Sequence, residues 1–144
     1  MAPIEAIQLQ SSYHNILDRL SALNRLVSRP LPSSQWQDDV RHEVQSLRQE
    51  LATHYELLDI GDYLEEVEHL CPGMHDQLAR LHREQELILE EVDEIAHELA
   101  ASRGAIGVST LAQLRLLLTH IQDHEDRKNR LVLEAFNSEA GAAD

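Results

Sequence analysis

This chain of 144 residues is poor in the residue types that build and connect β-strands. It has five glycines and four prolines, and aromatic residues make up only 3%. Because strands and their turns depend on aromatic, β-branched, glycine and proline residues, we exclude an all-β fold. Hydrophobic residues at 42% and charged residues at 26% indicate one globular domain of mostly helical composition.

The chain also has little cysteine and little positive charge. The single cysteine, Cys71, excludes an internal disulfide and a cysteine-based zinc site. Acidic residues outnumber basic residues by 26 to 12, and the resulting net charge of −14 repels a phosphate backbone, so nucleic acid is not an expected partner. No segment approaches the roughly 18 uninterrupted apolar residues of a membrane span, and the N-terminal segment does not resemble a secretory signal. We therefore expect a cytoplasmic protein that does not contact a membrane.

Apolar residues recur at helical spacing in four long segments of the chain. The breaks between these segments fall at Pro30 and Pro32, at Gly61, at Cys71-Pro72-Gly73, and at Gly104 and Gly107. Ser33 or Ser34 is expected to cap the second helix, and Thr110 with Gln113 has the spacing of a capping box at the start of the fourth. A short additional helix is expected over residues 62–70.

Four helices of about 25 residues with short connections favour an all-α fold, an antiparallel up-down-up-down four-helix bundle. We expect this bundle to span residues 1–137. The polar residues 138–144 are expected to form a flexible C-terminal tail.

Nine histidines in an acidic helical chain raise the question of a metal site, because bundles place histidine and carboxylate ligands on facing helices. Four histidines in polar contexts are expected to be solvated: His42, His69, His75 and His97. His14, His54 and His124 lie on or beside three apolar stripes, where an unpaired imidazole costs free energy. A hydrogen-bonded core histidine is the default interpretation of each, and the three together favour a shared site.

Three runs of sequence together resemble the bacterial hemerythrin-like, or HHE cation-binding, family. The runs are HYELLDIGDYLEEVEHLCPG from His54, RLHREQELILEEVDEI from Arg80, and HEDRKNRLVLEAFNS from His124. The resemblance covers almost the whole chain and implies a bundle that holds two irons and binds oxygen. It places three histidine ligands of the family on His14, His54 and His124.

Three further ligand positions of the family are substituted in this chain. Leu58 lies four residues after His54, where the resemblance implies a carboxylate that bridges the irons. Lys128 lies four residues after His124, at the second such position, and Gln85 replaces a histidine of the third helix. Hard iron ions need anionic oxygen ligands, whereas an ammonium group puts a positive charge where a second cation would bind. We therefore expect the di-iron site to be largely lost, with the remaining histidine ligands weak or unoccupied.

Two questions about this site stay open at the level of sequence. Lys128 either lies in the former metal cavity or extends its ammonium group to solvent. Within the cavity it would join a hydrogen-bonded polar core with His14, His54, Gln85 and His124, with Asp18 as its counter-charge. A metal would otherwise need substitute donors, of which His82 and His120 are the best placed; the others are Asp18, Asp59, Glu86 and Glu125.

We therefore expect a non-enzymatic binding or regulatory module that needs no cofactor and acts on an unidentified protein partner or by self-association. The alternative is a hemerythrin-like protein that binds or senses iron or oxygen through His14, His54, His124 and substitute donors. An enzyme is not expected, because the chain has no activated serine or cysteine, no phosphate loop and no inward carboxylate pair.

Overall fold

The computed structural model of this chain describes residues 3–60, 65, 69, 71–102 and 104–143. All regular elements in these ranges are helical, and the predicted all-α fold with four long helices is confirmed. The helices are α1 (Pro3–Ser28), α2 (Ser34–Ile60), α4 (His75–Ala101) and α5 (Val108–Ala143), with a 3-10 turn η1 (Pro72–Met74) before α4. None of the described helices is both long enough and apolar enough to cross a lipid bilayer.

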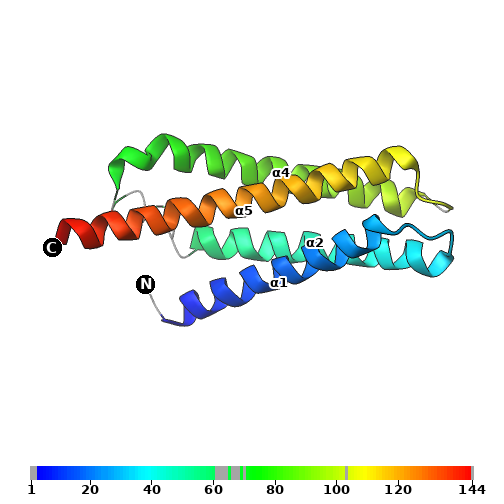
Figure 1. The fold of residues 1–144 in the computed structure, drawn as a ribbon, viewed down its shortest axis with the longest axis horizontal. Helices are drawn as coiled ribbons and strands as arrows, with labels where there is room; N and C mark the ends of the chain where they lie inside the picture. The colour runs from blue at the N-terminus through cyan, green and yellow to red at the C-terminus, as the bar shows by residue number, and fades with distance from the viewer. Residues whose placement is uncertain (1–2, 61–64, 66–68, 70, 103, 144) are drawn as a thin grey trace.

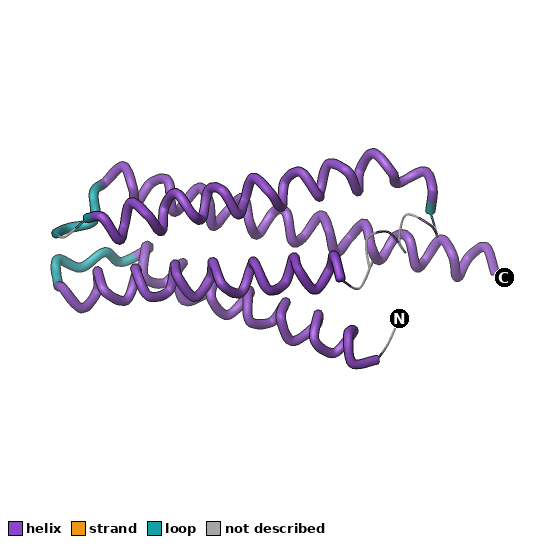
Figure 2. The backbone as a smooth tube through the Cα atoms, turned by 180° about the vertical axis from the view of Figure 1, so that it is seen from behind, coloured by secondary structure: helices purple, strands orange, loops and turns teal. Residues whose placement is uncertain are grey.

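The four long helices lie side by side in an elongated bundle, as the two opposite views show (Figures 1 and 2). Helix α1 packs against α2 and α5, and α4 packs against the same two helices. Each long helix therefore has two neighbours, and all four enclose one core.

Local signals place the ends of the first two helices as predicted. Helix α1 ends at Ser28, two residues before Pro30. The hydroxyl oxygen of Ser33 accepts a hydrogen bond of 3.1 Å from the backbone N–H of Trp36, which is the predicted N-cap contact at the start of α2. The indole N–H of Trp36 in turn donates to the carbonyl of Leu26 at 3.0 Å, so the short connection is fixed from both sides.

The predicted capping box at the start of α5 is wrong. The helix begins at Val108, and the N–H of Leu111 donates to the carbonyl of Gly107 at 3.0 Å. Thr110 therefore lies inside the first turn, and its hydroxyl donates to Oε2 of Glu98 on α4 at 3.3 Å. A contact with a neighbouring helix replaces the local cap.

The last helix extends beyond its predicted end. Helix α5 continues to Ala143, so residues 138–143 have helical backbone where we expected a tail. Alanine and glutamate are strong helix formers, and Gly141 is the one residue of this stretch that strongly opposes a helix. The short helix expected over residues 62–70 lies outside the described residues except at Glu65 and His69, which are helical and exposed.

The buried apolar residues form two clusters of unequal size. The larger cluster draws on all four long helices and reaches Ile88 on α4 and Ile121 on α5. The smaller cluster contains Leu78, Leu81 and Leu131. Between the two, along α4 and α5, the buried residues are polar. We call this the polar layer, and its members are His54, Gln85, His124, Glu125 and Lys128.

Candidate functional site

The polar layer crosses the bundle from α2 to α4 and α5. Each of its five residues is at most 4% exposed. A buried polar or charged group costs free energy unless another group hydrogen-bonds to it or neutralises it. The hydrogen bonds and ion pairs among these groups therefore define the layer.

Lys128 joins the two sides of the layer. Its Nζ atom lies 2.5 Å from Oε2 of Glu125 and 2.8 Å from Nε2 of His54. A protonated ammonium group has no lone pair, so Lys128 donates to Nε2 and the neutral His54 ring carries its proton on Nδ1. Burial lowers the pKa of Lys128, and the adjacent Glu125 carboxylate acts in the opposite direction. Lys128 is 4% exposed, so its ammonium group is buried and does not extend to solvent.

Both buried histidines are held in the neutral form. Burial is the main cause that lowers the pKa of His54 to about 3, and the charge of Lys128 adds to it. Burial and Lys128, in the same order, lower the pKa of His124 to about 4. Neither ring nitrogen of His124 has a hydrogen-bond partner within the described part of the chain. Its Nδ1 lies 3.9 Å from Oε1 of Glu84, which is beyond hydrogen-bond range.

The rings of Tyr55 and Tyr13 lie near these imidazoles. The ring centroid of Tyr55 lies 5.9 Å from that of His54 and 6.2 Å from that of His124. Burial and the Glu125 carboxylate raise the pKa of Tyr55, so its hydroxyl stays protonated. Tyr13 of α1 is half-buried, with its ring centroid 6.4 Å from that of His54. The layer is thus bounded by aromatic rings on the side of the large apolar cluster and α1.

The structure does not bring all of the predicted residues into this layer. His14 is exposed, and its one ring neighbour in the described chain is Tyr13, at 6.1 Å between centroids. Successive helical residues are about 100° apart, so His14 lies across α1 from the buried Ser12 and Ile16. The side chain of Leu58 lies outside the described residues. His54 and Lys128 do meet, and His124 lies close enough for the charge of Lys128 to act on it. Gln85 is buried on α4, but its Nε2 has no hydrogen-bond partner among the described residues. The four histidines expected to be solvated are exposed: His42, His69, His75 and His97.

The acidic partner of Lys128 differs from the one we expected. Asp18 is exposed and is not the counter-charge, because Glu125 holds that place. Among the substitute donors, His82 is exposed beside Glu86, and His120 is half-buried with its Nδ1 3.4 Å from Glu91. Neither side chain enters the polar layer, and their role as substitute donors stays a prediction.

Glu125 was expected only as a substitute metal donor, and Tyr55 was not expected in the site. The signal for Glu125 was its spacing of three residues from Lys128, which puts opposite charges on one helix face. The signal for Tyr55 was its place next to His54 on an apolar stripe wide enough to bury two adjacent positions.

A second ion pair closes the outer edge of the layer between α4 and α5. One guanidinium nitrogen of Arg127 donates to Oε1 of Glu84 at 2.7 Å, and a second nitrogen pairs with Oε2. These hydrogen bonds are the main cause that lowers the pKa of Glu84. Because Glu84 also faces His124, this pair separates the buried imidazole from the solvent side of the helices.

The residues of the layer do not fit a di-iron centre. No group of three or more His, Cys, Asp and Glu side chains in the described chain is arranged to hold a metal ion. Lys128 occupies the lone pair of His54 and one carboxylate oxygen of Glu125, and its positive charge repels a metal ion. Comparisons of the chain with protein-family models, with curated proteins and with solved structures find no match.

Proposed function

We propose that this chain is a hemerythrin-like bundle in which a buried ammonium group replaces the metal, and that it acts as a non-enzymatic binding or regulatory module. The resemblance in sequence and the helical architecture support this assignment. The carrying observation is the position of the Lys128 ammonium group between His54 and Glu125.

The lengths of the connections support the antiparallel up-down-up-down order of such a bundle. Residues 29–33 join α1 to α2, and five residues span at most about 18 Å. Returning to the starting end of a helix of 27 residues would require about 40 Å. The same argument applies to residues 102–107 between α4 and α5, and the chain colours in Figure 1 run in alternating directions along the bundle.

A lysine in this layer has a consequence for function. The ammonium group is part of the chain, so the charge of Glu125 is balanced without any bound ion. The fold then needs no metal-binding free energy, and the layer carries no redox centre. Such a bundle suits a role in which its surface binds a partner and its core does not change.

The alternative function, iron or oxygen binding through three histidines, has less support. His54 and His124 lie in the polar layer, but His14 is exposed on α1. His54 also directs its Nε2 lone pair to Lys128 rather than to an open position. No contact of the described residues favours this alternative over the first.

Restoring the ligands tests the proposed function. Gln85→His and Lys128→Glu together would place three imidazoles and two carboxylates in the layer, a donor set suited to iron. We expect this double variant to bind iron that the parent protein lacks, measured by elemental analysis of the folded protein. Glu90→His with Arg130→Glu is the matched control, because it introduces the same residue types at exposed positions of the same helices.

The iron content of the two variants tests whether the polar layer corresponds to the metal site of the family. Iron in the double variant and none in the control would support the correspondence between this layer and the metal site of the family. A folded double variant that takes up no more iron than the parent would remove the basis of the proposal.

A further inference from the structure

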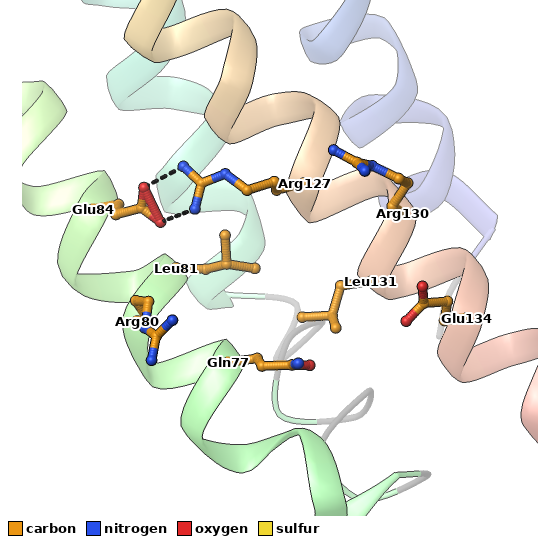
Figure 3. Close-up of a pocket in the computed structure, with 8 residues that line it drawn as sticks. All are labelled: Gln77, Arg80, Leu81, Glu84, Arg127, Arg130, Leu131 and Glu134. Carbon is orange, nitrogen blue, oxygen red and sulfur yellow. Dashed lines mark hydrogen bonds and ion pairs between the residues drawn. The ribbon is translucent and has the colours of Figure 1, made fainter.

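One outer face of the bundle is formed by α4 and α5, and it has two open cavities with different linings. The first cavity, of about 270 Å³, lies toward the start of α4 and is bordered by Arg80 of α4 and Arg130 of α5 (Figure 3). The second, of about 430 Å³, lies toward the end of α4 and is bordered by three glutamates of that helix: Glu91, Glu94 and Glu98.

The first cavity carries a net positive charge. Arg127 is neutralised by Glu84, so Arg80 and Arg130 stand against one carboxylate, that of Glu134. Neither Arg80 nor Arg130 forms an ion pair within the part of the chain that the structure describes. The two side chains point to opposite sides of the cavity (Figure 3). Each guanidinium group is therefore free to meet a separate carboxylate.

The second cavity carries a net negative charge. Its described lining contains no arginine or lysine. Glu91 lies 3.4 Å from Nδ1 of His120, and Glu98 accepts a hydrogen bond from the hydroxyl of Thr110. Glu94 is exposed and forms no ion pair with any described residue. The α4–α5 face thus has free positive charge at one end and free negative charge at the other.

An exposed leucine separates the two charged ends. Leu87 is 51% exposed and lies close to the middle of α4 (His75–Ala101). It stands seven residues after Arg80 and seven residues before Glu94. A spacing of seven returns to nearly the same side of a helix after about 10 Å. Arg80, Leu87 and Glu94 therefore form one stripe, with the leucine midway between opposite charges.

We propose that this face binds a second copy of the chain, as an antiparallel dimer with two-fold symmetry. An axis at Leu87 places Arg80 of one copy against Glu94 of the other, and the symmetry forms the same ion pair twice. The two Leu87 side chains meet at the axis. A uniformly basic or acidic partner would match only one end of the face. This inference rests on the proposed binding role and names the partner.

Helix α5 fits the same arrangement. Leu116 borders the second cavity and is 73% exposed. Because the axis exchanges the two ends of the face, Leu116 of each copy lies over the first cavity of its partner, beside Arg130. Contact there removes the exposed leucine from water, which favours association.

The face is also large enough for a stable dimer. Helix α4 has 27 residues and is about 40 Å long. Two helices side by side, each about 10 Å wide, give a face of about 800 Å² on each copy. Each partner contributes about this area to a stable protein–protein interface.

Sedimentation equilibrium tests the proposal, in about 150 mM salt to screen the general repulsion between two acidic chains. We expect the parent protein to have a mass of about twice the 16.4 kDa of one chain. Arg80→Glu and Glu94→Arg should each raise the dissociation constant of the dimer about tenfold or more, because each brings like charges together. The double variant Arg80→Glu Glu94→Arg should recover dimerisation, because it restores the ion pair with its charges exchanged.

Control variants separate this effect from a change in net charge. Arg25→Glu and Glu56→Arg make the same charge changes at exposed positions of α1 and α2, away from the α4–α5 face. Neither control should change the dissociation constant. Equal weakening by the controls and by the variants of the face would contradict the proposed interface.

Three further outcomes would overturn the proposal. These are a parent protein that is monomeric at about 1 mM, single variants of the face that dimerise like the parent, or a double variant as weak as the single variants. A monomeric parent would leave the face to a different protein. The iron test concerns the polar layer and does not depend on this face. If the parent is monomeric while Gln85→His with Lys128→Glu still takes up iron, the partner is wrong and the proposed function stands.

Discussion

The ammonium nitrogen of Lys128 lies 2.5 Å from Oε2 of Glu125, one turn earlier on the same helix, and both side chains are buried. The i, i+3 spacing brings the two charges together on one face of α5, without a contact from another helix. Lys128 then needs only the hydrogen bond to His54 to dock this pair onto α2. Within the polar layer, the ion pair on α5 is therefore joined to α2 at one imidazole, that of His54.

Removing one member of the pair should cost more than removing both. Lys128→Met leaves the Glu125 carboxylate buried without a cation, and we expect the free energy of unfolding to fall by about 3 to 5 kcal/mol. Adding Glu125→Gln removes the uncompensated charge, so the double variant should regain a large part of that loss. Urea unfolding at pH 7 of both single variants and the double variant measures the coupling. Strictly additive effects would show that the two charges do not depend on each other.

The buried histidines should make stability fall in acid. The pKa of His54 is about 3 and that of His124 about 4 in the folded state, both below the value of 6.5 for a free imidazole. Between these values the unfolded chain binds more protons than the folded chain, so the free energy of unfolding decreases as the pH falls below about 6.5. The slope reaches up to about 1.4 kcal/mol for each histidine and pH unit.

A histidine variant isolates this effect from the surface carboxylates, which titrate in both proteins. In His124→Gln, the decrease between pH 6.5 and pH 4.5 should be smaller than in the parent, by up to about 2.7 kcal/mol. Urea unfolding at pH 6.5, 5.5 and 4.5 checks the difference. Parallel pH profiles of the parent and the variant would mean that His124 titrates normally in the folded protein.

Arg41 should be a strong stabilising contact at the opposite end of the bundle. From α2 it donates hydrogen bonds of 3.0 Å to the carbonyl oxygens of Leu99, Ser102 and Gly104, at and just beyond the end of α4. These carbonyls lie at the negative end of the helix dipole, where a cation is favourable. We expect Arg41→Met to lower the free energy of unfolding by about 1 to 3 kcal/mol.

Arg48 provides the comparison on the same helix. Its ion pair with Asp93 is about half exposed on both sides. Exposed pairs of this kind contribute little, so Arg48→Met should cost under about 1 kcal/mol. Equal losses in the Arg41 and Arg48 variants would mean that the three carbonyl contacts add nothing beyond a surface charge.

The sequence predicts those features that depend on local signals. The spacing of apolar residues and Pro30 define α1, and Ser33 marks the start of α2, because each acts within a few residues of its position. Thr110 follows the same local pattern, but its hydroxyl donates a hydrogen bond to Glu98 on a neighbouring helix. No residue near Thr110 in the sequence indicates that contact. Local rules fail where a tertiary partner offers a competing hydrogen bond.

The candidate site shows the same limit. His54, Gln85 and His124 fall on apolar stripes and are buried, as helical periodicity predicts. The burial of Lys128 does not follow from periodicity, because a lysine stem reaches solvent from many buried positions. The contacts with Glu125 and His54 hold the ammonium group inside the bundle.

The central claim is that Lys128 replaces a metal ion in the polar layer. The most direct test is elemental analysis of the protein without a histidine tag, purified from cells grown with ample iron. We predict well under one iron per chain, because the ammonium group occupies a donor atom of His54 and one of Glu125 and its charge repels a metal ion. About two irons per chain, the content of an intact di-iron bundle, would contradict it.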